Sequence, residues 1–425
     1  MLIVNPTAED YAASITPVSL WRNRNFTTFW VSQTLSVAGD SFSLIAVPLL
    51  VLRATGSVAS MGLLTGAAGA AAIVSGFFAG AIVDRFDRRR LLIAADLARF
   101  VLYGAIPLAW MFGPHLWVVY ATVPLAAVFG MVFQVGYVTA VRDLVERDEI
   151  TEANGRLFAS QAAAGIGGTI AAGVVSGAFG PVTAIGVDAV TFGISALGLM
   201  FVRLRLFSRE TKGMHPLRDF AAGFRFLWHH PVLRALTALL CFFHFFYVGF
   251  ADILIFYIKQ VLGQPDRTVG AVMALSALGV VAGSLVVAPL RRRLGFGMSW
   301  IGSVILSGLV VALVGFTTTI FMVAGLAMAA IFFTSIGGIN SMSLRQQVTP
   351  DHLLGRVTST FWTIHKALSP IGAAVLTAAT GRFGVTQVLL VSGFVLAAVG
   401  VVGAFTPVRQ TRPELDQRQL GMDAA

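Results

Sequence analysis

The sequence predicts an all-α membrane protein whose chain crosses the bilayer twelve times. Of its 425 residues, 56% are hydrophobic and only 12% are charged, whereas a soluble domain carries about 25% charged residues. The apolar residues gather in runs of about 20, the length that a helix needs to cross a bilayer. The basic residues collect in alternate loops between these runs, as expected when cytoplasmic loops are enriched in Lys and Arg.

The apolar runs define the predicted spans in chain order. They are 26–51, 59–82, 91–112, 116–140, 154–177, 181–202, 233–258, 269–290, 298–317, 320–343, 357–380 and 384–405. An even number of spans places both termini on one side of the membrane. Of the 30 Lys and Arg residues, 24 fall in segments on the side of the N-terminus and four in the opposite loops. This split predicts that both termini are cytoplasmic.

The longest internal loop divides the spans six and six. We expect an N-terminal six-helix bundle (1–202), a cytoplasmic central loop (203–232), a C-terminal six-helix bundle (233–405) and a cytoplasmic tail (406–425). Within the central loop, Leu217–Trp228 is amphipathic, which favours a helix lying on the inner membrane surface.

The two halves share loop signals. Gly155-Arg156 opens the fifth span and Gly355-Arg356 opens the eleventh, while Arg88-Arg89-Arg90 and Arg291-Arg292-Arg293 end corresponding spans. Repeats of this kind are typical of transporters built from two related halves.

Small residues recur at four-residue spacing in three of the predicted spans. The pairs are Gly62/Gly66, Gly76/Gly80, Gly173/Gly177 and Gly279/Gly283. Small residues let helix backbones approach closely, and packing of this kind drives helix association in a bilayer. We therefore expect tight helix contacts at these positions, and such contacts are also compatible with helices that rock against each other.

The loop between the second and third spans carries a recognisable pattern. It reads Gly80-x-x-x-Asp84-Arg85-x-x-Arg88-Arg89 and resembles the loop signature of the major facilitator superfamily. The resemblance covers essentially the whole chain. It is greatest to the bacterial multidrug, macrolide and siderophore exporters, enterobactin exporters among them. The stretches that carry this likeness are Ala38-Gly39-Asp40, Asp84 to Arg89, Ala222 to Leu227 and Leu354-Gly355-Arg356-Val357.

The resemblance implies a conformational network at the inner loops. In the family, the loop carboxylate and arginines pair with charges and helix ends across the domain interface, which assigns this role to Gly80, Asp84, Arg85, Arg88 and Arg89. Asp84 would face the N-terminal end of the eleventh span, where unpaired N–H groups favour an anion. We expect Asp96 and Arg99, three residues apart, to pair on one helix face and to join this network.

Two positions depart from the family pattern. This chain has Asp87 where the loop usually has Gly. The fifth span reads Gly168 to Gly173 without the proline of the Gly-Pro-x-x-Gly-Gly signature found in proton-coupled antiporters.

Ionisable residues within predicted spans are candidates for proton coupling, because each costs at least about 2.5–3.5 kcal/mol to insert. Asp40 lies near the middle of the first span, where a carboxyl in a dry cavity can bind and release a proton. The alternative is a structural hydrogen bond to a neighbouring helix, for example through Gln33 or Ser36 of the same span.

Three further residues are weaker candidates for proton coupling. Lys366 lies at mid-depth in the eleventh span, where it could pair with Asp40 or Asp252 or attract an anionic part of the substrate; otherwise it would snorkel to the inner surface. Asp252 lies near the outer end of the seventh span, as an outer gate or proton exit. His244 could titrate there or be a packed core histidine.

Aromatic and polar residues on the same spans suit a mixed, amphipathic ligand. The candidates for the substrate cavity are Gln134, Tyr137, Phe242, Phe246, Asn340 and Trp362. The alternative is that most of them face lipid or pack against neighbouring helices.

Several motifs are absent from the sequence. No Gly-x-x-x-x-Gly-Lys-Ser/Thr loop occurs, and no His-Glu-x-x-His or paired His/Cys cluster. The single cysteine, Cys241, rules out an intramolecular disulfide. We therefore expect no ATP-driven motor, no metal, no cofactor, no enzymatic activity and no nucleic-acid partner.

The sequence thus predicts a secondary transporter in the inner membrane. It would act as a monomer and export an amphipathic or hydrophobic small molecule by alternating access, in exchange for protons. Two alternatives remain on the same fold. One is a flippase for lipids or lipid precursors, which would use lateral openings between the fifth and eighth spans. The other is a uniporter or importer.

Overall fold

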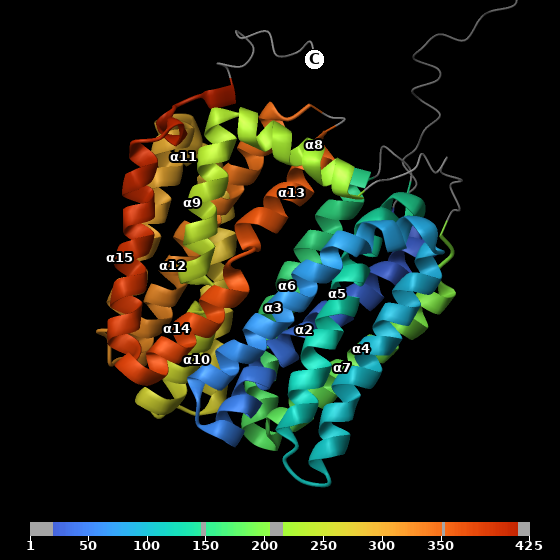
Figure 1. Cartoon of the computed structure of the whole chain (residues 1–425). Helices are drawn as coiled ribbons and strands as arrows, with labels where there is room; N and C mark the ends of the chain where they lie inside the picture. The colour runs from blue at the N-terminus through green and yellow to red at the C-terminus, as the bar shows by residue number, and fades with distance from the viewer. Residues whose placement is uncertain (1–19, 146–149, 205–215, 351–352, 415–425) are drawn as a thin grey trace, which may run out of the picture.

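The computed structural model describes residues 20–145, 150–204, 216–350 and 353–414, and every regular element within these ranges is a helix (Figure 1). The first part of the chain consists of η1 (Leu20–Arg22), α2 (Arg24–Thr55), α3 (Val58–Arg85), α4 (Arg88–Trp110), α5 (Leu116–Leu144), α6 (Ile150–Phe179) and α7 (Pro181–Phe201). The later part consists of α8 (Pro216–His229), α9 (Pro231–Tyr247), α10 (Phe250–Phe256), η2 (Tyr257–Val261), α11 (Asp266–Val314), α12 (Ile320–Val348), α13 (Leu354–Lys366), α14 (Ser369–Phe383), α15 (Val385–Ala404) and η3 (Pro407–Arg409).

Short polar residues start several of the long helices. The side chains of Asn23, Ser57 and Asp87 accept hydrogen bonds from backbone N–H groups in the first turns of α2, α3 and α4. These caps satisfy N–H groups that have no partner within the helix. The breaks between the apolar runs are therefore set locally by the sequence.

The helices account for the twelve predicted membrane crossings. Ten helices in the described part of the chain are long and apolar enough to span a bilayer. One of them, α11, contains two crossings, because its 49 residues turn back at Gly295, whose φ of 76° favours glycine. The backbone N–H groups of Phe296 and Gly297 donate to Thr411 and Gln410 at this turn. The broken helix α13–α14 supplies the remaining crossing.

Two crossings are interrupted near the centre of the molecule. The seventh crossing changes from α9 to α10 at Val248 and Gly249. The eleventh changes from α13 to α14 just before Pro370, whose ring nitrogen cannot donate to the carbonyl of Lys366 one turn earlier. These interruptions place His365, Lys366 and Asp252 beside irregular backbone.

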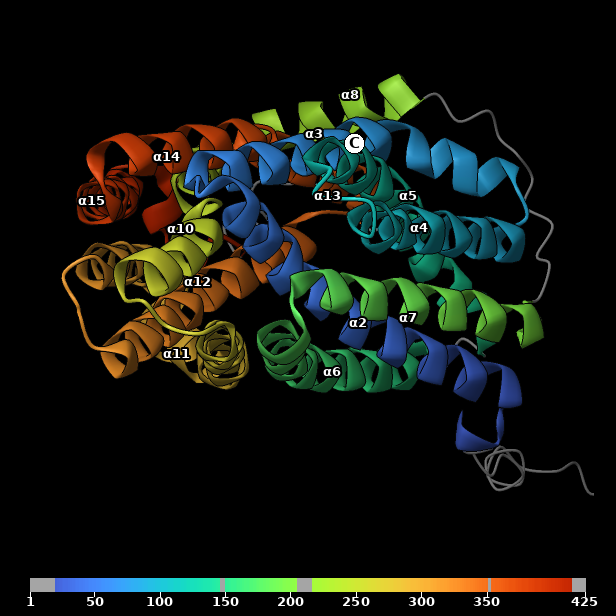
Figure 2. The ribbon, with the colours of Figure 1, turned by 90° about the horizontal axis from the view of Figure 1, so that it is seen from below.

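Helices α2–α7 and α9–α15 form two groups that lie side by side (Figures 1 and 2). The groups meet along two helix pairs, α3 with α14 and α6 with α11, which Figure 2 shows from below. A Cβ atom on Gly173 of α6 would lie 2.8 Å from the Cα of Gly270 of α11, and one on Gly66 of α3 would lie 2.7 Å from the Pro370 carbonyl. The pairs Gly62/Gly66 and Gly173/Gly177 therefore lie where the two groups touch, whereas Gly76 and the pair Gly279/Gly283 pack against helices of their own group.

The two ends of the molecule differ in how the groups meet. At the end predicted to be extracellular, here the outer end, Arg53 of α2 forms an ion pair with Asp266 of α11, and Lys259 pairs with the same carboxylate at 2.6 Å. At the opposite, inner end, the helices of the two groups diverge toward α8 (Figure 1). There α8 packs on α13 around Gly223, and Phe220 contacts Phe77 of α3 with ring centroids 5.9 Å apart.

Candidate functional site

A cavity of about 430 Å³ lies between the two groups of helices. Its walls come from α2, α3, α4 and α5 on one side and from the α9–α10 region and α11 on the other. Asp40 of α2 and Asp252 of α10 both line it. Two of the residues predicted for proton coupling therefore face the same space from opposite halves of the chain, and we refer to this space as the interface cavity.

Asp40 belongs to an ionic network inside the first group of helices. Its side chain is 50% exposed toward the cavity, and its Oδ1 lies 3.9 Å from Nη1 of Arg99 on α4. Arg99 is also hydrogen-bonded to Asp96, as the spacing of the two residues predicts. The guanidinium lies 4.6 Å and 4.1 Å from the ring centroids of Phe133 and Phe192. Arg99 is thus held in place by contacts on several sides.

A third carboxylate lies beside this network. Asp188 of α7 is fully buried and accepts hydrogen bonds from Ser43 of α2 and, at 3.4 Å, from Thr191. We refer to Asp40, Asp96, Asp188 and Arg99 together as the acidic cluster. Gln33 donates to Ser195 at 3.1 Å, so this amide is engaged with α7 and does not hold Asp40.

Asp252 is more isolated than the carboxylates of the acidic cluster. It is 4% exposed, and its Oδ2 has no hydrogen-bond partner in the described part of the chain. Thr65 of α3 lies close enough to interact with it and lines the same cavity. Asp252 lines the interface cavity, whereas the ion pairs at the outer end are formed by Arg53, Lys259 and Asp266. A role of Asp252 as an outer gate or proton exit stays a prediction.

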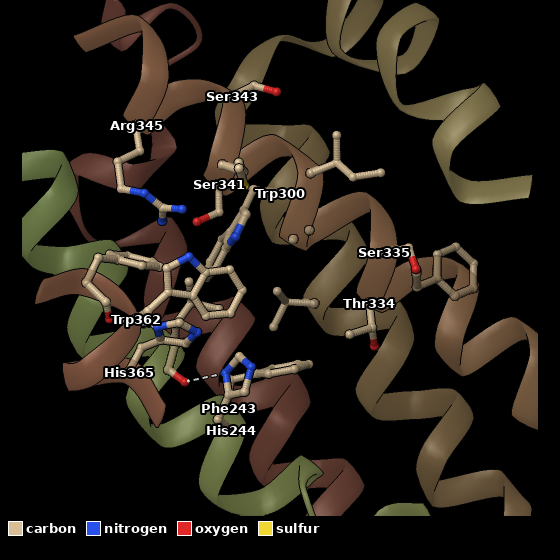
Figure 3. A pocket seen from close by; sticks show the side chains of 18 of the residues that line it. Phe243, His244, Trp300, Thr334, Ser335, Ser341, Ser343, Arg345, Trp362 and His365 are labelled. Carbon is tan, nitrogen blue, oxygen red and sulfur yellow. Dashed lines mark hydrogen bonds between the residues drawn. The ribbon is translucent and has the colours of Figure 1, made fainter. Parts of the chain in front are cut away.

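A second cavity, of about 490 Å³, lies inside the second group of helices (Figure 3). It is lined from α9, α11, α12 and α13, and we refer to it as the aromatic pocket. Its aromatic walls are Phe243, Trp300, Phe333, Phe361 and Trp362. The basic side chains that face it are His244, Arg345 and His365, and Figure 3 shows all three around the same space.

The two histidines of the pocket lie edge to face. Their ring centroids are 4.6 Å apart. His244 Nδ1 lies 3.0 Å from the Leu240 carbonyl, and His365 Nδ1 lies 2.7 Å from the Phe361 carbonyl. Because a carbonyl can only accept, each Nδ1 carries the proton. In the neutral rings Nε2 is then the remaining acceptor.

Lys366 lies at the C-terminal end of α13, next to the interruption of that crossing. Its Nζ is 4.4 Å from the Trp362 ring centroid, a cation–π distance. No ion pair of Lys366 occurs within the described residues, so the structure does not show the expected pairing with Asp40 or Asp252. Lys366 therefore adds positive charge beside the aromatic pocket.

The other residues predicted for the substrate cavity lie in different places. Asn340 donates to Ser299 at 2.8 Å and faces a separate space near Arg291. Tyr137 accepts from Gln161 at 2.9 Å and stacks on Phe29. Gln134 and Phe242 are exposed on the helix surface, and Phe246 packs against the core. Only Trp362 among the six lines the aromatic pocket.

The loop arginines connect helices within the first group. Arg88 pairs with Asp143 of α5, and Arg89 donates to the carbonyls of Leu199, at 3.1 Å, and Met200 at the end of α7. Both arginines therefore have partners within the first group, in contrast to the expected pairing across the domain interface. Arg99 pairs with Asp96 and lies 3.9 Å from Asp40, and among the described residues it has no ion pair with the loop. The surroundings of Gly80 and the side chains of Asp84 and Arg85 lie outside the described part of the structure.

Sequence reasoning missed Arg345, Trp300 and Ser341. The count of basic residues assigns Arg345 to a cytoplasmic segment, because it follows the last apolar residues of its span. The structure places it at 2% exposure inside the aromatic pocket. One signal was available: Ser341 and Arg345 are four residues apart and share a helix face.

The comparisons with known proteins match this arrangement. The family model described as Major Facilitator Superfamily matches residues 29–373. The multidrug efflux pump Tap of Mycobacterium tuberculosis (strain ATCC 25618 / H37Rv) is 25% identical over 385 residues, which cover 88% of this chain and 91% of that protein. The enterobactin exporter EntS of Shigella flexneri is 24% identical over 405 residues, which cover 92% of this chain and 94% of that protein.

Solved structures share the fold. The nucleoside transporter NupG superposes with a TM-score of 0.72 at 11% sequence identity, covering 90% of this chain and 98% of that one. A bacterial homologue of the iron transporter ferroportin, in an inward-facing state, superposes with a TM-score of 0.67 at 16% identity and with the same coverage. At these identities the likeness shows a shared fold over nearly the whole chain.

Proposed function

This chain belongs to the Major Facilitator Superfamily, and from that premise we propose that it exports amphipathic or hydrophobic small molecules in exchange for protons. It is a multi-pass transporter of the inner membrane whose relatives include efflux pumps. The observation that carries the proposal is the interface cavity, which Asp40 and Asp252 line from the two halves of the chain.

Alternating access would open this cavity to one side of the membrane and then to the other. Asp40 is the proposed proton carrier, because it is the carboxylate of the acidic cluster that faces the cavity and also contacts Arg99. Loss of the proton would strengthen its attraction to Arg99, and binding of a proton would release it. A protonation change at Asp40 would therefore alter the contacts of α2, a helix that reaches both the cavity and the outer ion pair of Arg53.

The outer end supplies the contacts that must separate during export. Arg53, Lys259 and Asp266 link the two groups there, and the backbones of α6 and α11 touch at Gly173 and Gly270. Opening to the outside would break these contacts while the inner end closes. The same contact leaves no lateral gap between α6 and α11 at this level, which is where a flippase was expected to open.

The proposal is tested by dye efflux from cells that express the wild type or Asp40→Asn. Cells are loaded with cationic ethidium or with anionic fluorescein, and efflux is followed with and without a protonophore. We expect the wild type to export at least one dye in a protonophore-sensitive manner and Asp40→Asn to lose this export. Glu414→Gln, which removes a carboxylate near the C-terminal end of the described chain, serves as the control and should behave as the wild type.

Two results would contradict the proposal. If Asp40→Asn reaches the membrane and retains protonophore-sensitive efflux, Asp40 is structural and the coupling site lies elsewhere. If the wild type moves neither dye, broad small-molecule export fails as the function.

A further inference from the structure

The aromatic pocket contains a buried cation with no counter-ion among the described residues. We propose that this pocket binds the negatively charged group of an amphipathic organic anion, with Arg345 as the anchor. The inference rests on the proposed transport function, because it names the chemical class of substrate that such an exporter would take. It is carried by the burial of Arg345, by unpaired donors around it and by the composition of the pocket walls.

Arg345 is buried without an ionic partner in the described part of the chain. It is 2% exposed, and its Nη1 has no hydrogen-bond acceptor there. The guanidinium lies over the Phe361 ring, with 3.8 Å between its carbon and the ring centroid. A buried charge is costly unless it is paired and hydrogen-bonded, and a ring face satisfies only part of a guanidinium with five donors. The side chain therefore lacks an acceptor within this part of the structure.

Two neutral donors beside Arg345 are also unpaired. The Ser341 hydroxyl is 2% exposed and the Trp300 side chain is fully buried, yet neither Ser341 Oγ nor Trp300 Nε1 has a partner within the described ranges. Both residues line the pocket with Arg345, and Figure 3 shows the three polar groups at the same end of it. Buried polar groups in native proteins are nearly always hydrogen-bonded, so several orphan donors in one cavity indicate a missing acceptor.

The chemistry of the walls favours an organic anion. None of the described residues that line the pocket is Asp or Glu. A further cation, Lys366, lies against Trp362 nearby. Away from Arg345 the walls are mainly aromatic and aliphatic, which suits an apolar body, and the volume of about 490 Å³ falls in the range of small-molecule sites. A carboxylate on an aromatic or aliphatic body meets all of these features.

A purely structural role explains less. Arg345 lies in the last turn of α12, where a cation is favoured by the helix dipole. That role does not account for the cavity in front of the guanidinium or for the unpaired donors of Ser341 and Trp300. A lipid phosphate would offer the same negative oxygens as a substrate carboxylate, and the experiment below separates these two sources.

The test compares two ligands that differ mainly in charge. Protein is reconstituted in nanodiscs of phosphatidylcholine, and binding of naphthoate and of neutral naphthamide is measured by equilibrium dialysis, with empty nanodiscs subtracted. We expect the wild type to bind naphthoate at least about tenfold more tightly, as charge-assisted hydrogen bonds predict. Arg345→Gln should abolish this preference, and Arg345→Lys should retain part of it. Arg382→Gln, which removes an exposed arginine at the outer end, should leave it unchanged.

The ligand comparison in the wild type does not depend on how well a variant folds. Equal affinity for naphthoate and naphthamide would overturn the proposal. Displacement of naphthoate when phosphatidylglycerol makes up half of the lipid would also overturn it, since the site would then belong to a lipid phosphate. Asp40→Asn should keep the naphthoate preference. The efflux experiment therefore tests the proposed transport function, and the binding experiment separately tests the anion site.

Discussion

The acidic cluster and the aromatic pocket place charges inside the two halves of the molecule in opposite ways. In the first half, two carboxylates pair with one arginine, which is flanked by the rings of Phe133 and Phe192. A third carboxylate, Asp188, lies beside them and accepts from hydroxyl donors. In the second half, Arg345 lines the aromatic pocket without a carboxylate among the described lining residues. Opposite charges of the protein itself face each other in the first set, whereas the described part of the second set holds charge of one sign.

This difference indicates that the first half is suited to respond to a proton and the second half to bind a ligand. A network whose ionic partners are protein groups can change its internal pairing when one carboxylate gains a proton. A site with unpaired donors gains most from a ligand that supplies the missing acceptors. The halves meet along the two helix pairs and the outer ion pairs, so movement between them is the route by which proton and substrate would be coupled.

The largest difference in stability between the two regions is expected when the central cation of each, Arg99 or Arg345, is removed. Arg99→Leu strands Asp96 without its ionic partner, and breaking a buried pair in this way costs about 3–5 kcal/mol. Arg345→Leu strands no described carboxylate and should cost far less, apart from its contact with Phe361. We expect Arg99→Leu to reduce the yield of monodisperse protein and its melting temperature in detergent, and Arg345→Leu to do so much less. Equal losses in the two variants would contradict the distinction between a paired and an unpaired cation.

The next effect concerns the surface that joins the two halves. Gly173→Leu cannot be accommodated against Gly270 while the outer end is closed. A bias of about 1.4 kcal/mol against one conformation already changes its population tenfold, so we expect dye efflux to fall at least about tenfold. Gly302→Leu is the matched control, because nothing in the described structure lies within 4 Å of a Cβ at Gly302. Normal efflux by Gly173→Leu would show that the outer contact does not need to close.

The sequence predicted the crossings and part of the first region. Twelve apolar runs correspond to the crossings, and the spacing of Asp96 and Arg99 is enough to predict that they can meet on one helix face. These features depend on local patterns that a single helix contains. The connection of Arg99 to Asp40 depends on how α2 and α4 pack, which the spacing within either helix does not contain.

The second region was harder to predict for a physical reason. Arg345 follows an apolar run, so a count of loop charges assigns it to the cytoplasmic surface. In the structure Phe361 of α13 lies over the Arg345 guanidinium, and this contact between two helices is not contained in the sequence of α12 alone. Trp362 and Phe242 are both aromatic residues within predicted spans, and both were predicted for the substrate cavity. Only Trp362 lines the aromatic pocket, whereas Phe242 is 58% exposed on the helix surface.

A smaller effect distinguishes two serines. Ser43 donates to the buried carboxylate of Asp188, and a hydrogen bond to a charged group contributes about 1.5–3 kcal/mol. Ser341 has no partner among the described residues, so Ser341→Ala should leave the free energy of unfolding nearly unchanged. We expect Ser43→Ala to lower the melting temperature, whereas Ser341→Ala should instead weaken naphthoate binding. A stability loss for Ser341→Ala as large as that for Ser43→Ala would mean that its hydroxyl already has a protein partner.

The smallest effect, a change in naphthoate affinity, is expected from substitution of Lys366. It tests whether Arg345 or Lys366 is the main anchor of the anion. Lys366 is exposed and contacts the Trp362 ring rather than the pocket interior, and such a cation–π contact contributes about 0.5–1 kcal/mol. Lys366→Gln should therefore weaken naphthoate binding by no more than roughly fivefold, and Lys366→Arg should restore it, since only a nearby positive charge is required. If Lys366→Gln removes the preference for naphthoate as completely as Arg345→Gln does, the anion lies at the break between α13 and α14. Arg345 would then be a structural cation held by Phe361.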